Sequence, residues 1–321
     1  MSFLPKPADA ISILHSKRAG IYYLEHCRVM MRDDRVEYVT DKKNDGSYYW
    51  NIPTGNTICI LLGSGTSLTQ AAARRLAEDG VMIAFVGGGG TPLFMASQSE
   101  YRPTEYCQGW FRKWHIDAHR LIMCQHLAHA RCDFIEPAWK SLGRLKGLDV
   151  TPSKPIALFR QAIDSAGTTN AIMEAEARCA KSLYAILAKT FALSGFTREH
   201  GKRDDKDLAN SHLDHGNYLA YGMAATVLWT LGIPHSLPVS HGMTRRGALV
   251  FDVADLVKDG IIMPLAFACA AEGISDQVFR DECVHELRRL KAMDHMFNMV
   301  KSTALLEIPE QDDATDSGVT E

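Results

Sequence analysis

Hydrophobic and polar positions follow two different periods along this chain, and the change falls near residue 100. Before it, short runs of β-branched and aromatic residues alternate with polar breaks, which is the pattern of β-strands. After Pro103 the apolar positions recur every three or four residues, over stretches rich in Ala, Leu, Met and Arg, which indicates helices. The sequence therefore predicts an α+β fold of two domains, with a small β-rich N-terminal domain and a larger all-α C-terminal domain.

The first domain contains short predicted strands separated by turn residues. These strands are Ile11–Leu14, Gly20–Leu24, Arg28–Arg32, Arg35–Thr40, Ser47–Trp50, Thr57–Leu62 and Val81–Val86. A helix is predicted over Ser67–Asp79, because Ser67 and Gln70 have the spacing of a capping box. Four consecutive glycines, Gly87–Gly90, then end the pattern.

The second domain is predicted to be helical throughout. Its expected helices are Cys107–Cys132, Pro155–Ser165, Thr169–Leu193, Gly216–Leu231, Phe251–Lys258, Pro264–Ala271 and Asp276–Met299. The chain is thereby divided into a β-rich domain (1–95), a linker (96–104), a helical domain (105–308) and an acidic tail (309–321).

The composition argues against a membrane-spanning or a secreted protein. No apolar run approaches the roughly 18 residues that a membrane-spanning helix needs, and the N-terminus lacks the apolar core of a secretory signal. Eight cysteines occur without a CxxC pair, which is typical of reduced thiols in a cytosolic protein. We therefore expect a cytoplasmic protein that has no membrane partner.

Charge is distributed unevenly. The net charge is −3, but five acids in the last twelve residues contribute −5, which leaves +2 for residues 1–309. The tail is polar, lacks aromatic residues and is predicted to be disordered. The segment 138–163 carries one acid and five bases, which are Lys140, Arg144, Lys146, Lys154 and Arg160. This segment permits a basic patch for nucleic acid, and an ordinary solvated loop explains it equally well.

A glycine-rich loop, Gly63–Ser67, follows a predicted strand and precedes a predicted helix, as in nucleotide-binding folds. It lacks the Gly-Lys-Ser/Thr run of a P-loop, and Leu68 stands where a dinucleotide fingerprint needs Gly or Ala. A tight turn followed by a capped helix explains the same glycines without any ligand. Nucleotide binding stays an alternative.

An acidic residue interrupts the apolar face of the helix predicted over Thr169–Leu193. Glu176 lies in the middle of a stripe formed by Ile172, Cys179, Ala180, Leu183 and Leu187. A carboxylate in such surroundings is costly unless a cation or strong hydrogen-bond donors stabilise it. The pattern predicts either a functional carboxylate or a buried salt bridge.

A histidine is the second candidate. His241 lies in a loop that follows Pro234 and Pro238. A loop stiffened by prolines can present an imidazole ring into a cleft.

Two aspartates follow this loop at a helical spacing. Asp252 and Asp255 are three residues apart and would share one face of a helix that is otherwise apolar. Two like charges on one face repel each other unless a positive group lies between or beside them. A divalent cation would remove that repulsion, and so would Arg245 or Arg246.

Two carboxylates and one imidazole form a mixed oxygen and nitrogen donor set. Such a set suits Mg²⁺ or Mn²⁺ better than structural zinc, which favours thiolates. A bound ion of this kind can clamp a phosphate and activate an attacking water or hydroxyl group.

The same residues carry a resemblance to a known family. Its motifs are Glu176-Ala177-Arg178, Tyr184, Tyr221-Gly222, His241, Phe251-Asp252-Val253-Ala254-Asp255 and, in the β-rich part, the loop Leu62–Thr69. In this order they resemble the integrase subunit of CRISPR adaptation, the enzyme that inserts new spacers, over about residues 10–305. The overall sequence pattern of the chain resembles the type I-F subgroup.

The resemblance implies that Glu176, His241 and Asp255 are the metal ligands and that Asp252 assists them. It also implies a homodimer formed through the β-rich domains. Two such dimers would be bridged by the small ferredoxin-like adaptation subunit, which in type I-F is fused to the helicase–nuclease. One departure is alanine at 175 and 177, where the family often has glycine.

The implied reaction is a transesterification, in which a protospacer 3′-hydroxyl attacks a phosphodiester at the border of a CRISPR repeat. Tyr221, Arg245, Arg246 and Lys258 are the candidate contacts to double-stranded DNA, although each could equally be a packing or surface residue. Two alternatives to an integrase remain: a nucleotide-binding enzyme that uses the Gly63–Ser67 loop, and a DNA-binding scaffold without catalytic activity.

Four histidines, His115, His119, His126 and His129, recur on one face of the first long predicted helix. They are interpreted as a polar stripe facing DNA or the other domain. A zinc site is the weaker alternative for this stripe.

Overall fold

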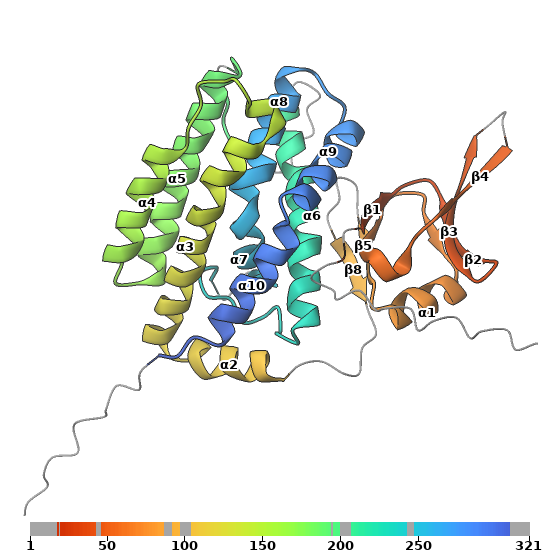
Figure 1. Cartoon of the computed structure of the whole chain (residues 1–321), viewed down its shortest axis with the longest axis horizontal. Helices are drawn as coiled ribbons and strands as arrows, with labels where there is room; N and C mark the ends of the chain where they lie inside the picture. The colour runs from red at the N-terminus through yellow and green to blue at the C-terminus, as the bar shows by residue number, and fades with distance from the viewer. Residues whose placement is uncertain are drawn as a thin grey trace, which may run out of the picture.

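The computed structural model describes residues 18, 20–42, 46–86, 92–96, 104–193, 195–199, 207–242 and 247–308. The predicted strand Ile11–Leu14, the glycines Gly87–Gly90, most of the linker and the acidic tail lie outside these residues. In the described part, strands fill the N-terminal region and helices the rest (Figure 1), which confirms the predicted α+β fold of two parts.

Among the described residues, the N-terminal part contains two four-stranded sheets, one α-helix and a short 3-10 turn (Thr54–Asn56). Its elements are β1 (Gly20–Leu24), β2 (Arg28–Arg32), β3 (Arg35–Lys42), β4 (Gly46–Asn51), β5 (Thr57–Leu62), β6 (Ser67–Leu68), α1 (Gln70–Glu78), β7 (Met82–Val86) and β8 (Pro92–Ala96). One sheet has the order β1-β5-β7-β8, in which the first three strands are parallel and β8 is antiparallel to β7. The other has the order β4-β3-β2-β6, so that β4 lies at an edge.

The start of α1 differs from the prediction. Ser67 and Leu68 pair with β2 as a short parallel strand, so the capping box at Ser67 was wrong. The residue that caps α1 is Thr69, whose hydroxyl accepts a hydrogen bond from the amide of Ala72 at 3.4 Å. Ladder pairing of the backbone thus overrode the local capping signal.

The C-terminal part is a bundle of helices. These are α2 (Glu105–Trp114), α3 (Asp117–Ser141), α4 (Ser153–Ser165), α5 (Thr169–Thr190), α6 (Leu208–Thr230), α7 (Ala248–Val257), a π-helical turn (Lys258–Ile262), α8 (Met263–Ala271), α9 (Asp276–Arg289) and α10 (Ala292–Ala304). Helices α4 and α5 lie on the side away from the strands, and α6 lies nearest to them (Figure 1). No described helix is long and apolar enough to cross a membrane.

Several helix bounds were predicted wrongly, and three of the differences change the arrangement of the helices. The segment predicted as Cys107–Cys132 divides at His115 and Ile116, and its second half continues as α3 to Ser141. Helix α6 begins at Leu208 rather than Gly216. The segment Asp276–Met299 divides at Lys291, which adopts a left-handed conformation with φ of 54° although no Gly or Pro marks the break.

Candidate metal centre

The three side chains expected to hold a metal ion meet at one cavity of the helical part. Glu176 comes from α5, His241 from the loop between α6 and α7, and Asp255 from α7, and all three line a cavity of about 170 Å³. The other lining residues are Arg131, Ala180, Tyr184, Arg198, Leu213, Asn217, Tyr221, Phe251, Lys258, Asp259 and Met263. Residues distant in the sequence thus form one site.

Helix α5 holds Glu176 at the cavity. Thr168 caps this helix by accepting from the amide of Ala171 at 3.2 Å, and the predicted apolar face is buried around Ile172 and Leu183. Arg131 Nη1 lies 2.8 Å from Glu176 Oε1, so the buried salt bridge that the sequence allowed is present. Burial raises the pKa of the Glu176 carboxyl, and the guanidinium of Arg131 only partly opposes this.

The loop that carries His241 is fastened to α2. The indole N–H groups of Trp110 and Trp114 donate to the carbonyl oxygens of Leu237 and Pro238 at 3.0 and 2.7 Å. These bonds hold the proline-framed loop against α2 just before His241.

Asp252 orients His241 from behind. Its buried carboxylate accepts from the amides of Val239 and His241 at 2.7 and 3.2 Å and from His241 Nδ1 at 2.6 Å. Since Nδ1 is engaged, Nε2 is the nitrogen left for a ligand. Burial lowers the pKa of His241, but the hydrogen bond and charge of Asp252 outweigh it, so the pKa is raised.

Among the described residues, Asp255 is balanced by a lysine; the arginines considered from the sequence, Arg245 and Arg246, lie outside that part of the chain. Lys258, one turn further along, pairs with Asp255 Oδ1. Burial raises the pKa of Asp255, but the charges of Lys258, Arg131 and His241 outweigh burial and hold this pKa below its usual value. Asp255 is therefore an ionised carboxylate at the cavity wall.

Sequence reasoning missed Arg131 and Asp259. Arg131 lies on α3 with Nε 2.9 Å from Asp259 Oδ2, and both side chains are buried. A signal was available, because Arg131 shares the apolar face of α3 with Leu127 and Ile135 in the way that Glu176 shares that of α5.

Two of the four candidate DNA contacts lie at the cavity. Tyr221 packs its ring edge-to-face against Phe251, with 4.7 Å between centroids, and the ammonium of Lys258 lies 5.2 Å from the Tyr221 ring. Arg245 and Arg246 lie outside the described residues.

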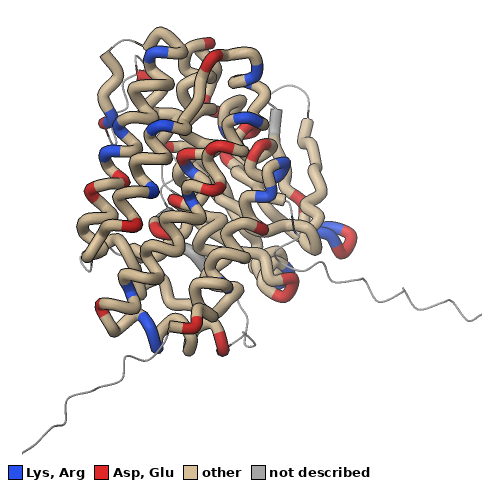
Figure 2. Tube along the Cα trace, turned by 60° about the vertical axis from the view of Figure 1, so that its left-hand side comes forward, with Lys and Arg blue, Asp and Glu red and all other residues tan. Residues whose placement is uncertain are grey.

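The basic segment 138–163 forms no isolated patch in the described structure. Lys140 pairs with Glu136, Arg160 with Asp133, and Arg144 with both Glu272 and Glu282. Positive and negative residues interleave over the helical part (Figure 2). The ion pairs do not favour a basic patch, and the solvated-loop interpretation is wrong for Lys140, Lys154 and Arg160, which lie on α3 and α4.

The histidine stripe does not form one cluster. His126 contacts Ser302 of α10 at 2.9 Å, His129 contacts Asp164 of α4 at 2.9 Å, and His115 lies in the break before α3. Packing between helices accounts for these contacts.

The glycine-rich loop is explained by packing. A Cβ on Gly63 would lie 2.6 Å from the Glu25 side chain, and one on Gly65, whose φ is +70°, would lie 2.4 Å from the ring of His26. The left-handed backbone at Gly65 and the close side chains at both positions favour glycine without any ligand, which weakens the nucleotide-binding alternative.

The donor set of the cavity suits a hard divalent ion. Glu176 and Asp255 supply carboxylate oxygens, and His241 supplies a ring nitrogen. Among the described residues, no three His, Cys, Asp or Glu side chains already surround a common point. The carboxylates instead face Arg131 and Lys258, each through one of its two oxygens.

Comparison with known proteins identifies the family. Residues 22–284 match the family model described as CRISPR associated protein Cas1. The chain belongs to the Cas1 family. It is 46% identical to a CRISPR-associated endonuclease Cas1 of Pseudomonas aeruginosa (strain UCBPP-PA14) over 314 residues, which cover 93% of this chain and 96% of that protein. The corresponding endonuclease of Pectobacterium atrosepticum is 45% identical over the same shares.

Solved structures support the Cas1 fold. The crystal structure of a TtCas1–DNA complex superposes with a TM-score of 0.63 at 24% identity, covering 91% of this chain and 94% of that one. A Cas6-RT-Cas1–Cas2 complex contains a chain that superposes with a TM-score of 0.62 at 12% identity, covering 94% of this chain and 36% of that one.

Membership in the Cas1 family confirms the resemblance seen in the sequence. It also confirms the expected class of enzyme, a DNA endonuclease and integrase of CRISPR adaptation with a general dependence on divalent metal. Neither a nucleotide-binding enzyme nor an inactive scaffold is favoured.

Proposed function

We propose that this chain joins the 3′-hydroxyl of a protospacer to a phosphodiester at the border of a CRISPR repeat, with Mg²⁺ or Mn²⁺ held by Glu176, His241 and Asp255. The observation that carries the proposal is the convergence of these three side chains on one cavity whose wall also carries cations. A divalent ion bound there would polarise the phosphate and stabilise the leaving oxygen.

Each proposed ligand has one polar atom engaged by a neighbouring side chain and a second one left for a metal ion. His241 offers Nε2 because Asp252 holds Nδ1. Glu176 offers Oε2 because Arg131 holds Oε1. Asp255 offers Oδ2, and the ammonium of Lys258 on its Oδ1 keeps the carboxylate ionised. Asp252 thus acts through His241.

Tyr221 and Lys258 would contact the DNA next to the reacting phosphate. The Lys258 ammonium lies between Asp255 and the Tyr221 ring, and its side chain is 18% exposed. A phosphate entering the cavity would therefore have this cation within reach. Arg245 and Arg246, in the segment before α7, are proposed to bind flanking phosphates by their position in the sequence.

The proposed homodimer is supported by the exposed sheet edge at β4, and the other proposed partners follow from the family resemblance. Strand β4 lies at a sheet edge and exposes Tyr48, Tyr49 and Trp50 by 37, 48 and 52%. Exposed aromatic side chains on an edge strand are typical of an interface, which supports a homodimer through the β-rich part. A type I-F assignment, with the small adaptation subunit fused to the helicase–nuclease and the reaction in the cytoplasm, rests on the family resemblance.

Strand transfer and DNA binding together test the proposed ligands. Asp255→Ala should abolish joining of a labelled duplex to a repeat-bearing plasmid. DNA affinity should stay within about tenfold of wild type, because the phosphate-neutralising groups remain. Wild-type joining by this variant would show that Asp255 is not a ligand.

A further inference from the structure

Arg131 is a buried charged residue in the wall of the cavity proposed as the metal centre. It lies within α3 and is 6% exposed. Its Nη1 lies 2.8 Å from Oε1 of Glu176, and its Nε lies 2.9 Å from Oδ2 of Asp259, an oxygen that Nη2 also contacts. One guanidinium thus spans two carboxylates, and one of them belongs to a proposed metal ligand.

Asp259 is itself fixed in place. It belongs to the π-helical turn Lys258–Ile262, is 4% exposed, and its carbonyl oxygen accepts from the indole N–H of Trp139 at 2.8 Å. The next residue, Gly260, brings this turn against α3, since a Cβ there would lie 2.8 Å from the Phe134 ring. Single π-helical turns of this kind occur often at functional sites.

The direction of the Glu176 carboxylate follows from these contacts. A glutamate side chain has three rotatable bonds, and its cavity position is selected only if one oxygen is held. Arg131 contacts Oε1, and the bonds of Asp259 to Arg131 and to Trp139 restrain the guanidinium and the turn. Asp252 does the same for the imidazole of His241.

We propose that Arg131, anchored by Asp259, is a positioning residue that directs Oε2 of Glu176 toward the metal ion. This proposal rests on the assignment of Glu176 as a ligand. It gives Arg131 a role beyond neutralising buried charge, since the planar fork of the guanidinium is needed to reach both carboxylates.

A charge-conserving substitution separates positioning from neutralisation. Arg131→Lys keeps the positive charge but loses the planar guanidinium, whose separate N–H groups reach both carboxylates. Binding of Mn²⁺ to the full-length protein, measured by isothermal titration calorimetry, should weaken about tenfold or more, because partners behind metal ligands typically contribute that much. A dissociation constant within twofold of wild type would overturn the proposal.

A charge-balanced pair of substitutions gives a second measurement. Arg131→Met with Asp259→Asn leaves the net charge unchanged and should also weaken Mn²⁺ binding about tenfold or more. The control is Arg144→Met with Glu282→Gln, which removes an ion pair of 2.5 Å elsewhere in the bundle. It should lower the melting temperature without changing Mn²⁺ affinity. Equal weakening by both pairs would mean general loosening and would overturn the positioning role.

If the double variant Arg131→Met with Asp259→Asn does not fold, Mn²⁺ binding by Arg131→Lys alone tests the positioning role. Glu176→Ala distinguishes this inference from the proposed function. Should wild type fail to bind Mn²⁺, or Glu176→Ala bind it normally, the ligand assignment falls and the positioning role with it. Binding that is lost in Glu176→Ala but kept in Arg131→Lys overturns the positioning role alone.

Discussion

Asp252 and Asp255 share one face of α7, but their carboxylates contact different parts of the site. Asp255 lines the cavity together with Glu176 and His241, whereas Asp252 lines a smaller space behind it and accepts hydrogen bonds from the His241 loop. The spacing of three residues predicted the shared face. The spacing could not predict that one carboxylate would face the loop and the other the cavity. That difference depends on where residues 239–241 pack against the helices.

Asp252→Asn should reduce strand transfer about tenfold to a hundredfold, because the amide is a weaker partner for Nδ1 of His241. DNA binding, measured by gel shift, should not change. Asp281→Asn, on the exposed side of α9, is the control. Full strand transfer by Asp252→Asn would contradict the role of Asp252 behind His241.

Glu176 could be found from the sequence because it interrupts an apolar stripe within one helix. Arg131 was missed because the predicted helix ended at Cys132, which placed this residue in a last turn where bases are ordinary. In the structure α3 continues to Ser141, so Arg131 lies mid-helix and is buried. The error in a helix boundary thus hid a residue of the site.

At the scale of elements, the start of α6 shows how packing overrides a local signal. Gly216 was taken as a helix start, yet it lies eight residues inside α6. A Cβ there would lie 2.4 Å from Cγ2 of Ile262 and 3.1 Å from the Phe279 ring. The glycine allows α6 to approach the π-helical turn, a tertiary contact that no local pattern can indicate.

Gly216→Ala should therefore lower the free energy of unfolding by about 1–3 kcal/mol through overpacking, measured by urea denaturation. Gly143→Ala, where a Cβ would meet nothing within 4 Å, is the control and should change stability by about 0.5 kcal/mol or less. Equal effects of the two substitutions would refute the packing explanation.

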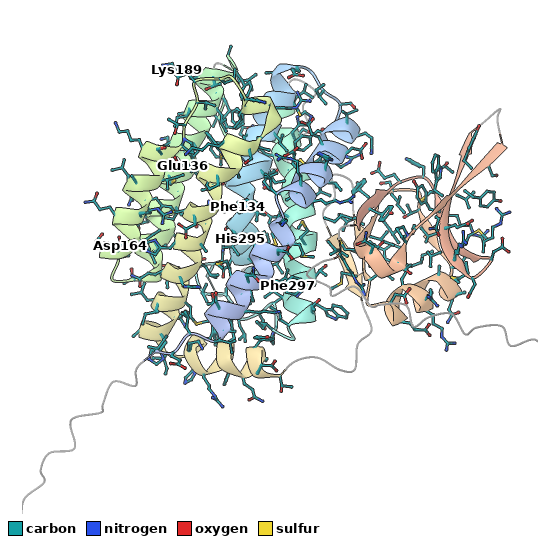
Figure 3. The ribbon with its side chains drawn as sticks, viewed as in Figure 1. Phe134, Glu136, Asp164, Lys189, His295 and Phe297 are labelled. Atoms are coloured by element: carbon teal, nitrogen blue, oxygen red, sulfur yellow. The ribbon has the colours of Figure 1, made fainter. Side chains whose placement is uncertain are left out.

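The contact between α3 and α10 should make stability sensitive to acid. His295 stacks on Phe134 with 4.7 Å between ring centroids (Figure 3). Burial lowers the pKa of His295, and the Ala130 carbonyl and Asp133 oppose this only in part. Below about pH 6.5 the unfolded chain therefore binds the proton more readily than the folded chain, so stability falls as pH falls.

His295→Phe keeps an aromatic ring and removes the titrating group. We expect its melting temperature to fall less than that of wild type between pH 6.5 and 5. His285, whose side chain is 69% exposed, provides the control His285→Gln. An unchanged pH slope in His295→Phe would exclude His295 as a source of the acid sensitivity.

At the scale of the whole molecule, the two predicted parts are less separate than the change of period suggested. Ile58, Cys59 and Leu61 of β5 belong to the same buried cluster as the helices, and Gly222 of α6 lies against Leu61. Every residue of β5 is buried, and a continuous apolar run of this kind is typical of a strand covered on both faces. Which elements cover its second face is a tertiary property that the run itself does not encode.

Chelation should stop the chemistry of the protein without unfolding it. The carboxylates at the cavity have protein cations as partners, since Glu176 faces Arg131 and Asp255 faces Lys258. With EDTA, strand transfer should cease while the melting temperature stays within a few degrees. A collapse of the folded signal would point to a structural metal site instead.

The most direct test of the account is strand transfer by Glu176→Ala, with Glu174→Ala as a matched control. Glu174 lies two residues away on the same helix and is exposed. Purified proteins would be mixed with a labelled duplex, a repeat-bearing plasmid, the small adaptation subunit and Mn²⁺ or Mg²⁺. We predict that wild type and Glu174→Ala join the DNAs and that Glu176→Ala does not. Joining by Glu176→Ala at the wild-type rate would contradict the proposed metal centre.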